Sequence, residues 1–186
     1  YAKDGVEVHI LCATKGEAGK NSNKVDKVHK VSKVENIKSI DQIREQELLE
    51  AAKVLGVKKV EFLNFVDGEL SNNKYHDLAK KISQKIAEFN PQVILTFDQK
   101  GISGHLDHIA VSYITTYSFS FMKQKIAKRL FYFARPNFGP YKSKIEDFFL
   151  NRYFIYHPEG YSKDEITTVI DVSGVRNIKV AAMKKH

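Results

Sequence analysis

The chain has 186 residues, of which 42% are hydrophobic and 28% are charged, and its formal net charge is +8. This size and composition are typical of one globular domain, and the longest uncharged run, residues 109–122, is too short to span a membrane. The positive charge suits an acidic partner, but most of the lysines fit solvated faces, so we expect no specific nucleic-acid binding.

Short runs of β-branched and aromatic residues predict six strands. They cover residues 6–14, 58–65, 91–97, 129–134, 152–157 and 167–173. The first and third runs are almost wholly apolar, which is typical of strands covered on both faces. The only cysteine, Cys12, lies in the first run, where we expect a small buried side chain. A single cysteine excludes an intrachain disulfide and agrees with a cytoplasmic protein.

Helical patterns alternate with these strands. Residues 41–56 form the first, with Ser39 or Asp41 as the expected cap at its start and Gly56 at its end. The others cover residues 75–91, a buried helix from near Gly104 to about residue 125, and residues 175–185. The alternation predicts an α/β fold with a mostly parallel sheet, in a single domain over residues 1–186.

One segment of low complexity follows the first strand. The sequence "KVDKVHKVSKVE" repeats a Lys/Val pair every third residue over residues 24–34, a period that suits neither a strand nor a long helix. We expect a mobile basic surface loop. Because it follows the carboxyl end of a strand, it either covers a ligand site or is a solvated insertion.

Two histidines and an aspartate follow the third predicted strand, in "GISGHLDHIA". His105 and His108 share one helix face, and Asp107 is placed to orient an imidazole. Open α/β sheets bind ligands at this end of their strands. From the residues alone, the pattern fits either the edge of a metal or proton-transfer site or a polar helix start. A catalytic zinc site needs further ligands, and His157 and His186 are the remaining histidines of interest.

The turn after the first strand reads "ATKGEAGK", residues 13–20. Its spacing is not that of a phosphate-binding loop, and we expect Glu17 to hold neighbouring loops by hydrogen bonds. In chain order, "ATKGEAG", "REQELLEAAKVLGVKKVEFLNFVDGEL", "PQVILTFDQKGISGHLDHIAVS" and "IDVSGVRNIKVAAMKKH" resemble the LmbE-like, or PIG-L, family of zinc-dependent N-acetylglucosaminyl deacetylases. The resemblance implies a Rossmann-like three-layer α/β sandwich. It also implies metal-dependent hydrolysis of the acetamide of an N-acetylglucosamine-containing small molecule or glycoconjugate.

The resemblance assigns a role to each residue of the cluster. His108 matches the zinc ligand of this motif, and His105 matches the histidine that stabilises the oxyanion and protonates the leaving amine. Asp107 matches the acidic residue that tunes that histidine. Arg44 and Asp98 match positions that contact the sugar.

The chain departs from the family pattern at two places. Leu106 stands where the family usually has proline, which changes loop stiffness and removes no ligand. The Ala-His-Pro-Asp-Asp motif, which supplies two zinc ligands and the general base, is missing. The resemblance therefore implies a fragment truncated at its start and within its last helix, which we expect to bind zinc poorly and to lack activity.

Two other functions remain open from the residues. One is a metal-dependent phosphoesterase or nucleotide hydrolase on a similar sheet. The other is a non-enzymatic basic α/β module that binds nucleic acid through the Lys/Val repeat, with steeply salt-dependent affinity.

Overall fold

The computed structural model describes residues 1–18, 39–122, 127–137 and 160–185. The chain divides into two compact units, the first made of Tyr1–Asp67 and Asp171–His186 and the second of Gly68–Ile170. The single domain expected from the sequence stays a prediction. The Lys/Val repeat, the predicted strand 152–157, His157 and His186 lie outside the described residues.

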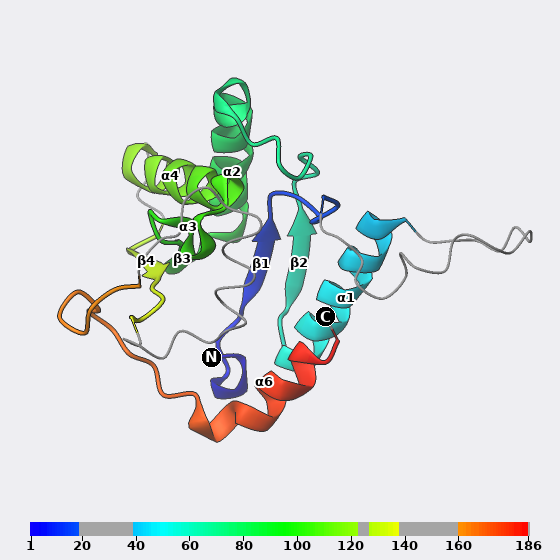
Figure 1. Ribbon diagram of the computed structural model, residues 1–186, viewed down its shortest axis with the longest axis vertical. Helices are drawn as coiled ribbons and strands as arrows, with labels where there is room; N and C mark the ends of the chain where they lie inside the picture. Colours follow the sequence, from blue (N-terminus) through cyan, green and yellow to red (C-terminus); the bar gives the residue numbers. More distant parts are fainter. Residues whose placement is uncertain (19–38, 123–126, 138–159, 186) are drawn as a thin grey trace, which may run out of the picture. The chain divides into compact units, whose positions relative to one another are not determined.

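The first unit combines a parallel strand pair with two helices (Figure 1). Strand β1 (His9–Cys12) pairs in parallel with β2 (Lys59–Phe62). Helix α1 (Ile40–Leu55) packs against α6 (Arg176–Met183). Each helix has one buried small side chain, Ala52 on α1 and Ala182 on α6. Two short 3-10 helices, η1 (Ala2–Asp4) and η4 (Ser173–Val175), complete the unit.

The ends of α1 agree with the caps predicted from the sequence. Ser39 is the N-cap, and the Gln42 side chain accepts a hydrogen bond from the Ser39 N–H at 3.2 Å. Gly56 ends the helix with a φ of 74°, a left-handed conformation that glycine adopts without steric cost.

The Cys12 side chain is partly buried on β1, and burial raises the pKa of its thiol to about 11. We expect iodoacetamide at pH 8 to alkylate Cys12 roughly twentyfold more slowly in the folded protein than in urea. Only the thiolate reacts, and its much smaller fraction outweighs the higher nucleophilicity of the more basic thiolate. In the folded protein, the rate should still rise between pH 9 and pH 11. A rate that levels off near pH 9, with circular dichroism unchanged, would contradict the raised pKa.

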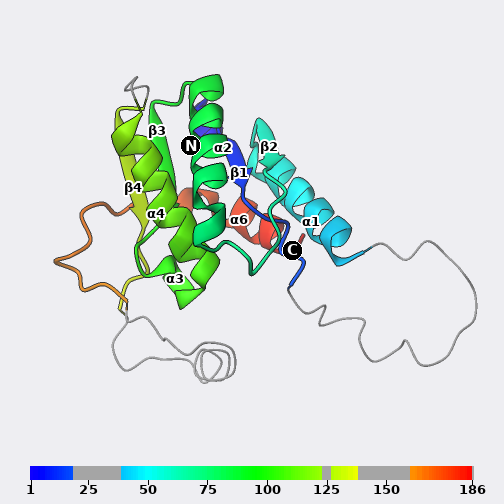
Figure 2. The same cartoon turned by 90° about the horizontal axis from the view of Figure 1, so that it is seen from above.

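The second unit holds the other parallel strand pair and a two-helix layer (Figure 2). Strand β3 (Val93–Phe97) pairs in parallel with β4 (Arg129–Phe133). Helix α4 (Leu106–Phe121) packs against both β3 and α2 (Tyr75–Phe89), which follows the 3-10 helix η3 (Asn72–Lys74). Its buried hydrophobic side chains are Leu70, Leu78, Ile82, Ile86, Ala110, Ile114 and Ala127.

These elements confirm the α/β class with parallel strands, and two sequence expectations are corrected. Residues 167–173 form no strand, and Val169 is 84% exposed. A β-branched run becomes a strand only beside a hydrogen-bonding partner, and no described segment pairs with this one. Helix α4 is not buried on all sides, because Tyr113, Tyr117 and Phe121 are exposed along one face. No helix of the described residues is long and apolar enough to cross a bilayer.

Candidate active site

A tight turn carries the chain from β3 into α4. Asp98 follows the strand directly, and its side chain is almost completely buried. Its Oδ1 accepts a hydrogen bond from the Ile102 N–H at 2.6 Å, and its main-chain oxygen accepts one from the Gly101 N–H at 2.9 Å. The carboxylate therefore holds the single-turn helix α3 (Gly101–Gly104) against the end of the strand.

This turn contains a strained residue. Ile102 has φ 60° and ψ −56°, a combination that a β-branched side chain rarely adopts. Gly101 also has a positive φ, 66°, and a Cβ atom there would lie 2.9 Å from Ile109 Cγ1. The turn thus needs glycine at position 101, and Ile102 adopts its unfavourable conformation with its N–H bonded to Asp98 Oδ1.

The His108 ring is oriented by two contacts. Its Nδ1 lies 3.1 Å from the main-chain oxygen of Gly101, and its face stacks on Phe97 with ring centroids 4.1 Å apart and planes 7° from parallel. Because a carbonyl oxygen only accepts hydrogen bonds, Nδ1 carries the proton. In the neutral ring Nε2 therefore keeps its lone pair, which is the form that binds a metal ion.

The neighbouring histidine has the opposite arrangement. His105 is the N-cap of α4, and its Nδ1 accepts a hydrogen bond from the Asp107 N–H at 3.1 Å. In the neutral ring the proton is then on Nε2. The His105 and His108 ring centroids lie 5.2 Å apart. Two adjacent imidazoles thus offer one Nε2–H donor and one Nε2 lone pair.

Asp107 holds a loop that comes from elsewhere in the sequence. Its carboxylate is buried, with Oδ2 accepting from the Gly68 N–H at 2.7 Å and Oδ1 from the Leu70 N–H at 3.3 Å. The resemblance implied that Asp107 tunes His105, and that role stays a prediction. The sequence did not predict that Asp107 binds the N–H groups of Gly68 and Leu70. These donors lie 39 and 37 residues before it, and no local pattern links residues at that separation.

In the first unit, Glu17 holds two segments together, as the sequence predicted. Its Oε1 accepts from the Asp67 N–H at 2.9 Å and its Oε2 from the Lys15 N–H at 3.2 Å. Asp67 returns a contact, since its Oδ2 accepts from the Ala18 N–H at 3.1 Å. The turn after β1 and the segment after β2 are joined by these carboxylates.

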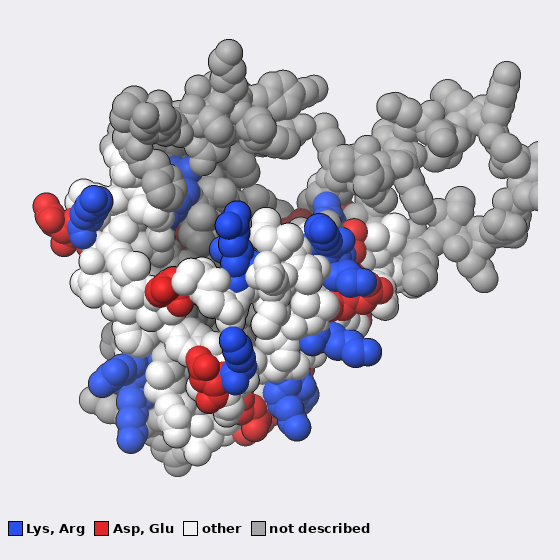
Figure 3. Space-filling model, turned by 90° about the horizontal axis from the view of Figure 1, so that it is seen from below, with Lys and Arg blue, Asp and Glu red and all other residues white. Residues whose placement is uncertain are grey.

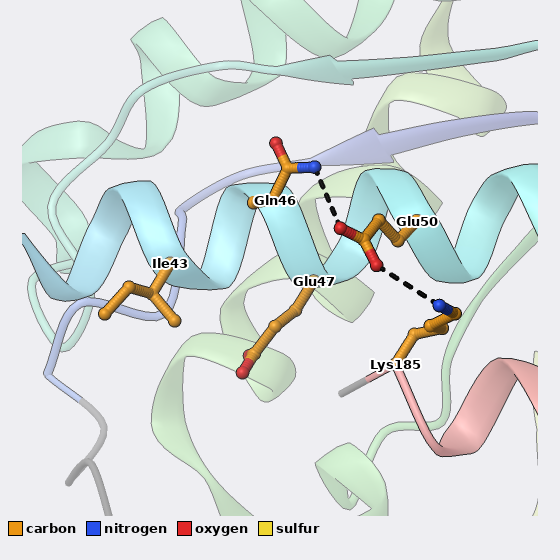
Figure 4. A pocket seen from close by; sticks show the side chains of 5 residues that line it. All are labelled: Ile43, Gln46, Glu47, Glu50 and Lys185. Carbon is orange, nitrogen blue, oxygen red and sulfur yellow. Dashed lines mark hydrogen bonds and ion pairs between the residues drawn. The ribbon is translucent and has the colours of Figure 1, made fainter. Parts of the chain in front are cut away.

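Arg44 belongs to α1 in the first unit, where its Nη1 lies 3.1 Å from Glu47 Oε2. Its contact with a sugar stays a prediction. Glu47 also lines an open pocket with four other side chains, shown in Figure 4: Ile43, Gln46, Glu50 and Lys185. Glu50 accepts from Gln46 at 3.0 Å and pairs with Lys185 at 3.5 Å, so the polar groups along this pocket are largely engaged with one another.

The described residues do not form a complete metal centre. No group of three or more His, Cys, Asp or Glu side chains in this part of the chain is arranged to hold a metal ion. The tautomer of His108 fits a metal ligand, so the cluster supplies one candidate ligand and one neighbouring hydrogen-bond donor.

The charge distribution bears on the nucleic-acid alternative. On the face drawn in Figure 3, basic side chains lie scattered, and several stand next to acidic ones. A binding surface for nucleic acid would gather lysine and arginine into a patch or stripe. The Lys/Val repeat, on which that alternative depends, lies outside the described residues.

Parallel strands, alternating helices and a histidine pair behind the carboxyl end of a strand define an α/β protein with a candidate ligand site at that end. The chain belongs to the PIG-L family, described as GlcNAc-PI de-N-acetylase, whose sequence profile matches residues 1–118. This match confirms the family expected from the motifs.

The proteins similar to the chain include two curated relatives and one solved structure. The mycothiol S-conjugate amidase of Streptomyces coelicolor is 33% identical over 133 residues, which cover 64% of this chain and 44% of that protein. The probable N-acetylglucosaminyl-phosphatidylinositol de-N-acetylase of Schizosaccharomyces pombe is 32% identical over 108 residues, covering 55% of this chain and 36% of that protein. The chain therefore spans less than half the length of these relatives.

The solved structure is the N,N'-diacetylchitobiose deacetylase from Pyrococcus horikoshii. It matches with a TM-score of 0.59 and 20% identity, covering 100% of this chain and 60% of that one. At this identity the match shows the fold alone. It confirms the α/β fold class, and the names of the family and of both curated relatives are those of de-N-acetylases and an amidase.

Proposed function

We propose that the protein is a zinc-dependent N-deacetylase, a hydrolase that removes the acetyl group from an N-acetylglucosamine-containing small molecule or glycoconjugate. The observation that carries the proposal is the pair of contacts at the two Nδ1 atoms: His105 Nδ1 accepts from the Asp107 N–H, and His108 Nδ1 lies 3.1 Å from the Gly101 oxygen. From these contacts we infer opposite tautomers for the two rings. Amide hydrolysis on a metal needs a ligand nitrogen that carries a lone pair rather than a proton, next to a donor for the carbonyl oxygen. The family match and the names of the relatives support the acetamide as the substrate group.

His108 would hold the metal through Nε2, and its ring is kept in place by Gly101 and Phe97. When bound, zinc supplies Lewis-acid polarisation of the acetyl carbonyl and lowers the pKa of a water molecule to about 7. The described residues supply a single ligand of this kind, so the proposal requires further ligands and a general base beyond this cluster.

His105 donates a hydrogen bond from Nε2–H to the oxygen on which negative charge develops. A well-placed donor of this type contributes about 3–4 kcal/mol of transition-state stabilisation. As long as Nδ1 accepts the Asp107 N–H, the ring holds one proton and stays a hydrogen-bond donor. Water then adds to the acetyl carbon, the C–N bond breaks, and the leaving amine receives the proton that the general base took from water.

Arg44 and Asp98 are the two residues that the sequence offers for contact with the sugar. Asp98 is almost completely buried, so the proposal keeps Arg44 alone for this role. The single cysteine is in keeping with a cytoplasmic location. Neither a phosphoesterase nor a nucleic-acid-binding module has a specific observation in its favour.

The test is acetate release by the full-length protein. We expect acetate and a new primary amine, in equal amounts, from N-acetylglucosamine linked to inositol, to malate or within a short oligosaccharide. Removing the metal with a chelator should abolish the reaction, and added zinc should restore it. The matched control is the same panel with glucose in place of N-acetylglucosamine. Phosphate release from phosphomonoesters without acetate release from any acetamide would overturn the proposal in favour of a phosphoesterase.

A further inference from the structure

We propose that Asp98 is a positioning residue that, through the strained turn at Ile102, aims the Gly101 carbonyl at His108 and so keeps the lone pair on His108 Nε2. The catalytic meaning of this role rests on the proposed function. The positioning itself depends only on hydrogen bonds within the second unit. Asp98 acts through these bonds and not by direct contact with substrate.

The first step is the state of the Asp98 carboxylate. The residue is only 3% exposed, and a buried carboxylate is costly unless it accepts strong hydrogen bonds. Its Oδ1 accepts a short hydrogen bond from the Ile102 N–H, at 2.6 Å. A side chain so enclosed is better suited to hold the protein than to recognise a ligand.

The second step is the conformation that this hydrogen bond holds. Ile102, at φ 60° and ψ −56°, carries strain of the kind that persists only when the surroundings enforce it. The Asp98 Oδ1 contact with its N–H is the enforcing interaction that the structure shows. Without that acceptor, the turn is expected to relax toward a negative φ at position 102.

The third step connects the turn to the imidazole. Ile102 directly follows Gly101, so rotation of the peptide unit between them moves the Gly101 carbonyl oxygen. That oxygen is the acceptor for His108 Nδ1, at 3.1 Å. A Cβ atom on Gly101 would lie 2.9 Å from Ile109 Cγ1 and 3.1 Å from His108 Cβ, so the turn is packed tightly against the start of α4. Relaxation of the turn therefore breaks the His108 hydrogen bond.

The test measures the His108 tautomer directly in the full chain, by 15N NMR of the ring nitrogens at pH 8.5. The wild-type protein should show the proton on Nδ1. In Asp98→Ala, the ratio of Nδ1–H to Nε2–H should fall at least about fivefold, as expected for one lost hydrogen bond. Asp98→Asn keeps an acceptor oxygen and should stay close to wild type, and Ser112→Ala on α4 is the control for a buried change outside the turn.

A second variant removes the strain instead of the acceptor. Glycine adopts a positive φ without steric cost, so Ile102→Gly relieves the strain at this position. The ratio of Nδ1–H to Nε2–H on His108 should therefore fall less in Asp98→Ala/Ile102→Gly than in Asp98→Ala alone. If Asp98→Ala fails to fold, the double variant should fold, and failure of both would overturn the proposal. An unchanged tautomer in folded Asp98→Ala would also overturn it. A wild-type protein with the Nδ1–H form but no deacetylase activity would contradict only the proposed function.

Discussion

Replacing His108 with alanine is expected to abolish deacetylation and to release the metal, whereas replacing His105 with alanine should slow turnover and leave the metal bound. The difference follows from the two tautomers, since His108 offers a lone pair at Nε2 and His105 offers an N–H. Loss of a metal ligand should lower kcat/KM by at least about 10³-fold. Loss of one oxyanion donor should lower kcat by about 10²- to 10³-fold.

Two measurements on each full-length variant separate these outcomes. Acetate release gives kcat and KM, and elemental analysis after dialysis gives the metal content per chain. His76→Ala is the matched control, because His76 is an exposed histidine in the first turn of α2, another helix of the same unit. Full metal content in His108→Ala, or metal loss in His105→Ala, would contradict the assigned roles.

Asp107→Ala is expected to lower the free energy of unfolding by about 1–4 kcal/mol. The variant removes both carboxylate oxygens and leaves the Gly68 and Leu70 N–H groups without their acceptor. Leu70 is buried, and a buried donor left unsatisfied costs about 1–3 kcal/mol. Gly68 is exposed, so water replaces its acceptor at a smaller cost.

Urea unfolding measures this change, and hydrogen exchange locates it. The control is Asp77→Ala, which removes an exposed aspartate from the first turn of α2 and should cost no more than about 1 kcal/mol. Amide protection should fall at Gly68 and Leu70 in Asp107→Ala and stay unchanged there in Asp77→Ala. If Asp107 acted only on the His105 ring, the two variants would unfold at similar urea concentrations.

The sequence predicted a helix correctly where capping residues or the apolar period marked that helix. Ser39 and Gly56 delimit α1, and the apolar period of α2 places Leu78, Ile82 and Ile86 in the core. Local sequence signals were insufficient at residues 167–173, where β-branched residues alone predicted a strand. A strand depends on a neighbour to which its backbone can bond, and the local sequence does not contain that neighbour.

The sequence by itself determined the α/β class, the parallel strands, the helix that begins at the histidine pair and the family, because these depend on period, caps and motif order. Only the tertiary structure decided what the site residues do. The proton on His108 depends on the Gly101 carbonyl, and the Asp107 carboxylate on N–H groups 39 and 37 residues away. Tautomers and buried hydrogen bonds are properties of atoms that folding brings together, and no spacing of residue types specifies them.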